Sequence, residues 1–131
     1  MEIRQATTED FAAIQVLIAQ YPEKLLQDHL PQPEEFFVAI ADDPSTSSGQ
    51  VVGCCALEVY SQRLAEVRSL AVVKEFQRKG IATQLIERCL QEARAKNVFE
   101  VLAITGANAL FEKHGFGTFK DEKYALIKVL S

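Results

Sequence analysis

The chain has 131 residues, of which 48% are hydrophobic, and a formal net charge of −4 at pH 7. This length fits one domain with one core, and this hydrophobic content argues against a disordered chain. The acidic balance argues against nucleic acid as a partner, and no apolar run approaches the roughly 18–20 residues that would span a membrane.

Three cysteines, two of them adjacent at Cys54 and Cys55, make a poor disulfide framework and fit a reducing compartment. The first residues lack the basic start and apolar core of a signal peptide, so we expect a cytoplasmic protein. The two histidines, His29 and His114, lie far apart, and no cysteine pair has metal-ligand spacing. No metal is therefore expected.

The N-terminal part predicts a strand followed by helices. Residues 2–6 are expected to form the first strand, and Thr7 is suited to cap a helix because Asp10 follows three residues later. Apolar residues then recur at helical spacing up to Pro22, which ends the helix: Phe11, Ile14, Leu17, Ile18 and Tyr21. The next apolar spacing predicts a short second helix over residues 23–30.

Three apolar runs predict the central strands. Residues 35–41 and 51–60 are expected to pair antiparallel across the polar segment 42–50, which reads as a hairpin connection. After a short turn, residues 64–73 form the next expected strand.

Residues 81–96 carry the strongest helical pattern, with a face expected to be buried: Ile81, Ala82, Leu85, Ile86, Cys89, Leu90 and Ala93. Residues 98–104 then return as a strand. A strand, a long helix and a second strand predict a parallel, right-handed crossover. A short helix over residues 107–114 and a closing strand over residues 124–130 complete the expected order.

The turn between the strand 64–73 and the helix 81–96 has the sequence Gln77-Arg78-Lys79-Gly80-Ile81-Ala82. Gly80 lets the main chain approach an anion, two cations precede it, and the positive end of the helix dipole points outward. Such a turn binds phosphate groups. It is neither a Walker loop nor a dinucleotide fingerprint. Considered alone, it could equally be a basic helix start that binds nothing.

The neighbouring residues add a resemblance to a known family. Gln77-x-x-Gly80-x-Ala82 fits the pattern Gln/Arg-x-x-Gly-x-Gly/Ala of the GNAT superfamily of acyl-CoA-dependent N-acyltransferases, and it follows Leu70-Ala71-Val72 at that family's spacing. Residues 3–10, Val52-Gly53 and residues 110–116 resemble other parts of the same family. Residues 52–57 and 65–72 are most similar to the acetyltransferase domain of N-acetylglutamate synthases.

The resemblance covers nearly the whole chain, so it implies one acetyltransferase domain over residues 1–131. The implied fold is of the α/β (α+β) class. It has a mixed, mostly antiparallel twisted sheet of about six or seven strands flanked by about four helices.

The resemblance also implies acetyl-CoA as co-substrate and no metal. Backbone groups of Leu70, Ala71 and Val72 would bind the pantetheine arm and the thioester carbonyl. Backbone N–H groups of the turn and the first helical residues would bind the pyrophosphate: Gln77, Arg78, Lys79, Gly80, Ile81, Ala82 and Thr83.

Transfer to an amine needs a base, because an ammonium group cannot attack a thioester. Glu66 is the candidate, since several members of the family carry a catalytic glutamate on this strand. Arg68 is the candidate for binding a substrate carboxylate. The alternative is that Glu66 and Arg68 are solvated or simply pair with each other. Phe111 stands where many members have a tyrosine that protonates the leaving thiolate, and phenylalanine cannot do this.

The implied function is acetyl transfer from acetyl-CoA to the amine of a small molecule, an amino acid being one candidate, by direct attack in a ternary complex. Two alternatives stay open: acetylation of a protein or peptide, and acetyl-CoA binding with little turnover. The expected partner is a small-molecule amine, a homodimer is one possible assembly, and neither nucleic acid nor a membrane is expected.

Overall fold

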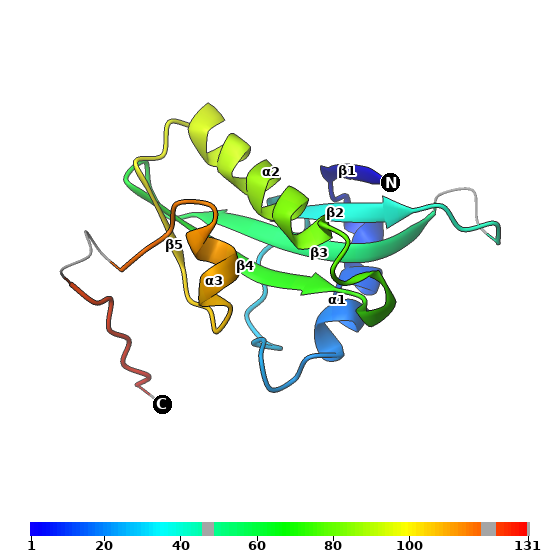
Figure 1. Ribbon diagram of the computed structural model, residues 1–131, viewed down its shortest axis with the longest axis horizontal. Helices are drawn as coiled ribbons and strands as arrows, with labels where there is room; N and C mark the ends of the chain where they lie inside the picture. Colours follow the sequence, from blue (N-terminus) through cyan, green and yellow to red (C-terminus); the bar gives the residue numbers. More distant parts are fainter. Residues whose placement is uncertain (46–48, 119–122, 131) are drawn as a thin grey trace.

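The computed structural model describes residues 1–45, 49–118 and 123–130, and their strands form one sheet in the order β1-β2-β3-β4-β5 (Figure 1). The strands are β1 (Glu2–Gln5), β2 (Phe36–Ala41), β3 (Gln50–Val59), β4 (Leu64–Val72) and β5 (Glu100–Ala103). The helices are α1 (Phe11–Ala19), α2 (Ile81–Ala95) and α3 (Asn108–Glu112), with 3₁₀ turns at Thr8–Asp10, Pro33–Glu35 and Lys74–Phe76. None of the helices in these ranges is long and apolar enough to cross a membrane.

The sheet is mixed, as the sequence predicts. β1 to β4 pair antiparallel in sequence order, and β5 joins β4 in parallel after the crossover through α2. The pairing of β4 with β5 runs only from Leu64 opposite Glu100 to Val67 opposite Ala103. β4 continues to Val72. Its last residues therefore extend beyond the part that β5 pairs with.

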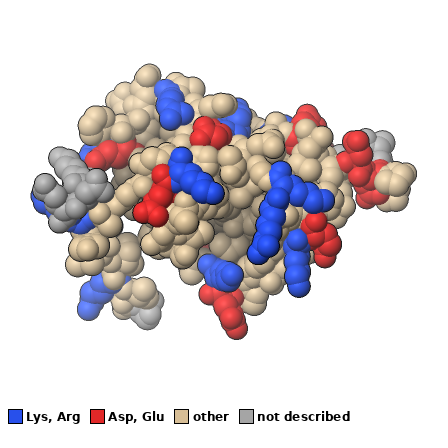
Figure 2. All heavy atoms as spheres, viewed as in Figure 1, with Lys and Arg blue, Asp and Glu red and all other residues tan. Residues whose placement is uncertain are grey.

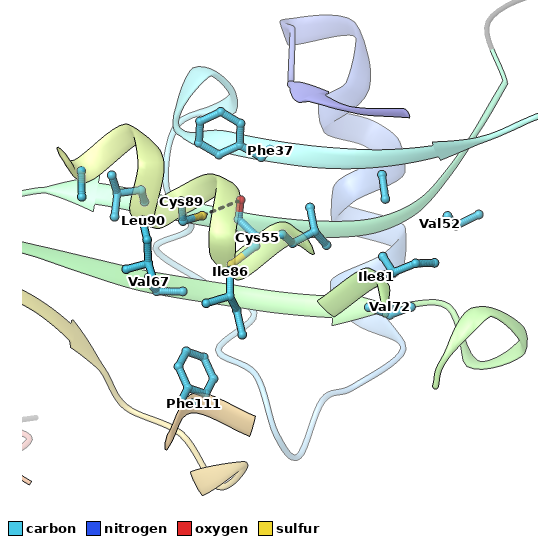
Figure 3. Packing of buried hydrophobic residues seen from close by; sticks show 14 of the residues in the cluster. Phe37, Val52, Cys55, Val67, Val72, Ile81, Ile86, Cys89, Leu90 and Phe111 are labelled. Carbon is cyan, nitrogen blue, oxygen red and sulfur yellow. Dashed lines mark hydrogen bonds between the residues drawn. The ribbon is translucent and has the colours of Figure 1, made fainter. Parts of the chain in front are cut away.

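α1 and α2 cover opposite faces of the sheet, and each face has its own core (Figure 1). On the α2 face, Cys55, Val67 and Val72 pack against Ile81, Ile86 and Cys89, as Figure 3 shows. On the other face, Ile14, Leu17 and Ile18 of α1 pack against a second set of strand residues: Phe36, Val38, Cys54, Ala56 and Ala71. The prediction that the apolar residues spaced along 11–18 and 81–93 form the buried faces of two helices is confirmed.

Two expected elements are absent from the described residues. Residues 124–130, expected to close the sheet, form no regular strand, and Leu126 and Leu130 are 88% and 87% exposed. The described sheet therefore has five strands, fewer than expected, because an apolar β-like run becomes a strand only when its backbone pairs with another strand. Residues 46–48 of the expected hairpin connection lie outside the described residues, although β2 and β3 do pair antiparallel.

The expected helix over residues 23–30 is also wrong, and the described residues contain three α-helices rather than about four. Gln27 donates from its side-chain amide to the carbonyls of Ile18 and Leu25, both at 3.1 Å. His29 has a φ of 57°, which a right-handed helix does not allow. One helical bond, from the Leu25 N–H to the Tyr21 carbonyl at 3.0 Å, starts this loop, and side-chain bonds to the main chain then take over.

Asp10 gives a testable stability prediction for the start of α1. Its carboxylate accepts from Arg4 at 2.8 Å and from the Thr7 N–H at 2.7 Å. The bond from Arg4, against the opposing effect of burial, lowers the pKa of Asp10 below its ordinary value. We expect Asp10→Asn to destabilise the protein by about 1 kcal/mol at pH 7.

This contribution depends on pH in a defined direction. Because the pKa of Asp10 is lower in the folded protein, its stabilisation is present above the unfolded-state pKa of about 4 and is lost as the pH falls through the folded value. Urea unfolding of wild type and Asp10→Asn should therefore converge in acid. Asp28→Asn, at an exposed carboxylate, is the control, and a wild-type advantage that does not shrink as the pH falls below about 4 would contradict the assignment.

Candidate active site

The turn between β4 and α2 has the backbone of an anion site. Gln77 is extended, Arg78 has a φ of 63°, and Gly80 has a φ of 83° and directly precedes Ile81, the first residue of α2. No side chain caps the start of this helix. The first N–H groups of α2 have no partner within the helix, so they face outward and can bind an anion.

Glycine is favoured at position 80 by its positive φ and not by steric crowding. A Cβ at this position would meet no heavy atom within 4 Å. The space in front of Gly80 is therefore open, and only a positive φ disfavours other residues. Arg78 and Lys79 are exposed beside it, with the Lys79 ammonium 5.2 Å from the centre of the Phe76 ring. In Figure 2, basic side chains gather over the end of β4 and the start of α2.

The side chain of Gln77 points back to the end of β4. Its amide donates to the Val72 carbonyl at 3.1 Å and to the Tyr21 hydroxyl at 2.9 Å. Tyr21 in turn donates to the same Val72 carbonyl at 2.5 Å. The sequence indicated Tyr21 only as an apolar position of the first helix, and it lies just beyond α1.

A bulge interrupts β4 before this point. Cys54 faces Ala71 across the ladder and Ala56 faces Arg68, so two steps on β3 match three steps on β4. The extra residue is accommodated at Ser69, whose φ is 58°, and the Ser69 carbonyl accepts from the Cys54 thiol at 3.4 Å. Bulges are frequent beside active sites because they redirect the backbone locally.

Of the residues expected to bind the cofactor, those on β4 lie after this bulge and those on the turn lie around the start of α2. Leu70 is half-buried, and Ala71 and Val72 are buried. In the turn and the first helical residues, exposure varies: Gln77, Arg78, Lys79, Gly80 and Thr83 are exposed, Ala82 is half-buried and Ile81 is buried.

Glu66 and Arg68 lie before the bulge, both half-buried. Their neighbours Ala65 and Val67 belong to the α2-side core, so the alternation of a strand directs Glu66 and Arg68 to the α1 side. Arg68 forms an ion pair with Glu58 of β3 and donates to the His29 carbonyl at 3.1 Å. The expected alternative, a direct Glu66–Arg68 pair, is thus replaced by a pair with Glu58.

Glu66 has a different partner, the hydroxyl of Tyr60, which donates to Oε1 of Glu66. Glu58 and Glu66 face each other directly across the ladder, so Arg68 and Tyr60 offset the repulsion between two carboxylates. Burial and the Glu66 carboxylate raise the pKa of Tyr60, which keeps its hydroxyl protonated. Burial is the largest single effect on Arg68 and opposes its charge, but the hydrogen bond and charge of Glu58, together with the nearby Glu66 carboxylate, outweigh burial and raise the pKa of Arg68. Sequence reasoning missed Glu58 and Tyr60, because a cross-strand register is not visible in the chain.

Phe111 and the cysteines do not offer acid or nucleophile chemistry. Phe111 is 5% exposed, points toward Ile86 in Figure 3 and packs edge-on against Phe116 at 5.2 Å between ring centres. Burial raises the pKa of Cys54 to about 12, so its thiolate is scarce at neutral pH. Cys55 and Cys89 are also buried free thiols. No group of metal-ligating side chains occurs in the described part of the chain.

A cavity of about 670 Å³ lies on the other side of β5. Its lining includes Val101 and Ala103 of β5, Phe111 of α3, and Tyr124 and Ala125 of the C-terminal segment, but no residue from 70 to 83. The cavity therefore lies between β5, α3 and the C-terminal segment and is separate from the turn and from Glu66 and Arg68.

The helix of the parallel crossover begins at an open, cationic glycine turn, beside a bulged strand that continues past its neighbour. This arrangement fits the class of acyl-CoA-dependent acyltransferases that the sequence resembles. The chain belongs to the GNAT family, because residues 32–118 match the family model described as an acetyltransferase (GNAT) domain. It is therefore an acetyl-CoA-dependent N-acetyltransferase.

Two curated relatives match most of the chain. An uncharacterized N-acetyltransferase of Chlorobaculum tepidum is 33% identical over 117 residues, covering 89% of this chain and 69% of the relative. An amino-acid acetyltransferase of Mycobacterium tuberculosis is 34% identical over 119 residues, covering 87% of this chain and 67% of the relative.

Solved structures agree with the fold. A Mycobacterium tuberculosis protein in complex with CoA has a TM-score of 0.80 at 34% identity, over 91% of this chain and 73% of that one. N-acetylglutamate synthase from Neisseria gonorrhoeae, complexed with CoA and N-acetyl-glutamate, has a TM-score of 0.77 at 27% identity. That match covers 93% of this chain but 30% of the synthase, so this chain corresponds to only a part of it.

Proposed function

We propose that the protein transfers an acetyl group from acetyl-CoA to the amine of a small molecule that also carries a carboxylate, such as an amino acid. The observation that carries this proposal is the cluster of Glu66 and Arg68 on β4, directly before the bulge. One group suits a base and the other suits a carboxylate. The similarity to an amino-acid acetyltransferase and to a CoA and N-acetyl-glutamate complex supports the same substrate class.

In this proposal, main-chain groups bind acetyl-CoA. The N–H groups from Gln77 to Thr83 would bind the pyrophosphate, helped by the charges of Arg78 and Lys79. Leu70, Ala71 and Val72 would bind the pantetheine arm and the thioester carbonyl. Because the Val72 carbonyl already accepts from Tyr21 and Gln77, we assign its N–H rather than its carbonyl to this role.

The proposed chemistry is direct attack. Glu66 takes a proton from the substrate ammonium, and the neutral amine forms a C–N bond to the thioester carbon. A backbone N–H near Leu70 stabilises the oxyanion of the tetrahedral intermediate. The C–S bond then breaks and CoA leaves as a thiolate. After the attack the amine nitrogen still carries one proton more than the amide needs. Water passes that proton to the thiolate in this scheme, since Phe111 has none to give, and Glu66 later releases its own proton to solvent.

The function is tested by following CoA thiol release with panels of amino acids, polyamines and peptides. Release with amino acids and not with polyamines is the expected result. Release only with peptides would favour the protein-acetylating alternative. If CoA binds but no amine releases it above background, the chain is a binding module and the proposal fails.

Arg68→Lys tests the carboxylate assignment. Lysine keeps the charge but loses the planar fork that pairs with two carboxylate oxygens. We expect the KM for the amino acid to rise about tenfold, with the KM for acetyl-CoA unchanged. Arg63→Lys, at a 75% exposed arginine that pairs with Glu100 at 3.1 Å, is the matched control. An unchanged amino-acid KM would remove Arg68 from the acceptor site.

The cytoplasm is the proposed location, supported by three buried free thiols that suit a reducing compartment. A homodimer stays a prediction, and sedimentation of the purified protein would test it.

A further inference from the structure

We infer that Tyr21 is a positioning residue that holds the cofactor turn in its binding geometry through Gln77 and the Val72 carbonyl. The inference rests on the proposed role of residues 77–83 in binding the pyrophosphate. Tyr21 would touch neither the acetyl group nor the amine, so its effect is on the affinity for CoA and not on the chemical step.

Three polar groups form a closed triangle at the end of β4. Tyr21 donates to the Val72 carbonyl at 2.5 Å, and Gln77 donates to the same carbonyl at 3.1 Å and to the Tyr21 hydroxyl at 2.9 Å. The two donor hydrogens of the Gln77 amide are thus both used, and the Val72 carbonyl accepts twice. Each group limits the freedom of the other two.

The triangle lies at the entrance of the cofactor turn. Val72 is the last residue of β4, and Gln77 follows the 3₁₀ turn Lys74–Phe76 and precedes Arg78, where φ becomes positive. Gln77 is exposed and the turn itself carries no buried side chain. Phe76 packs against the α2-side core, but residues 77–80 that follow it are exposed. The two bonds of the Gln77 amide are therefore a main restraint on the direction of the N–H groups of these residues.

Tyr21 also connects this turn to the loop that contacts Arg68. It begins the loop after α1, and Gln27 ties that loop to the end of α1 through the Ile18 carbonyl. Further along the same loop, the His29 carbonyl accepts from Arg68. One loop therefore contacts both the cofactor turn, through Tyr21, and the proposed acceptor residue Arg68.

Tyr21→Phe removes only the hydroxyl and keeps the ring. One Gln77 N–H and one lone pair of Val72 then lose their partner, and the turn gains freedom that CoA binding must remove. We expect the Kd for CoA, measured by calorimetry, and the KM for acetyl-CoA to rise about threefold to tenfold, with kcat unchanged. Tyr124→Phe, at a 78% exposed tyrosine, is the matched control and should leave both values as in wild type.

Gln77→Met tests the same contact from the other side, since methionine has a similar length and no donor. If the two residues act as one unit, the double variant should bind CoA no more weakly than the worse single variant. Thermal unfolding of each variant separates a loss of fold from a loss of positioning, and Gln77→Met serves alone if Tyr21→Phe unfolds.

The outcomes separate this inference from the proposed function. If wild type fails to bind CoA, the proposed function falls and the inference with it. If wild type binds CoA and Tyr21→Phe binds it equally well, only the inference is overturned. Additive effects of Tyr21→Phe and Gln77→Met, or a fall in kcat at unchanged KM, would also overturn it.

Discussion

Gly80→Asp is expected to weaken CoA binding about a hundredfold while leaving the fold intact. A Cβ here would meet no heavy atom within 4 Å, so the folded protein has room for the side chain. The new carboxylate would occupy the open space in front of the first N–H groups of α2. Its repulsion of the pyrophosphate should cost about 2–3 kcal/mol, or about a hundredfold in Kd. Calorimetry with CoA measures this directly.

Gly115→Asp is a closely matched control. Gly115 has a φ of 88° against 83° for Gly80, and a Cβ there also meets nothing within 4 Å. Backbone strain should therefore destabilise both variants by a similar amount, of order 1 kcal/mol. Only Gly80→Asp should lose CoA. Equal losses at both positions, or wild-type affinity in Gly80→Asp, would refute the pyrophosphate assignment.

Glu66→Gln is expected to lower kcat by about a hundredfold or more, because a positioned general base contributes roughly 10²–10⁴. Glutamine keeps the size of the side chain and can still accept from the Tyr60 hydroxyl, so the cluster should keep its shape. The KM for acetyl-CoA should not change, since Glu66 lies before the bulge and the cofactor residues lie after it. Steady-state rates from pH 6 to pH 9 measure both, over a range that brackets neutrality.

Glu58→Gln decides which of the two facing carboxylates is the base. It should free Arg68 from its ion pair and change the amino-acid KM more than kcat. Glu92→Gln, on the outer side of α2 in a pair with Arg88 at 3.3 Å, controls for the loss of a carboxylate as such. Should Glu58→Gln lose kcat while Glu66→Gln keeps it at every pH, the roles assigned here are reversed.

The shape of the proposed cofactor turn could be predicted from the sequence because its determinants are local. A strand, Gly80 and a helix with an apolar face follow one another within some 30 residues, and the positive φ of Gly80 is what a glycine at a helix start indicates. The sequence predicts a role for the backbone N–H of Gln77. That its side chain turns back to Val72 depends on Tyr21, 56 residues earlier, and no local pattern indicates that contact.

The surroundings of the proposed acceptor residues could be predicted only in part. Glu66 and Arg68 stand out as charges on an apolar strand, but their partners Tyr60 and Glu58 follow from the register between β3 and β4. The bulge at Ser69 shifts that register by one residue, and an apolar pattern alone does not show where an extra residue is accommodated. The strand predicted over residues 124–130 is wrong for the same reason, because strand formation depends on a partner elsewhere in the chain.

The bulge on β4 has a consequence for the balance between stability and activity. Removing Ser69 would leave Cys55 of β3 opposite Leu70, with the pairs on both sides unchanged, so the ladder would run without a break. A left-handed, non-glycine residue would also disappear. Such a shortened chain should melt at a higher temperature than the natural one and yet be a poor enzyme. The bulge would then be an irregularity that the reaction needs and that the stability of the fold does not.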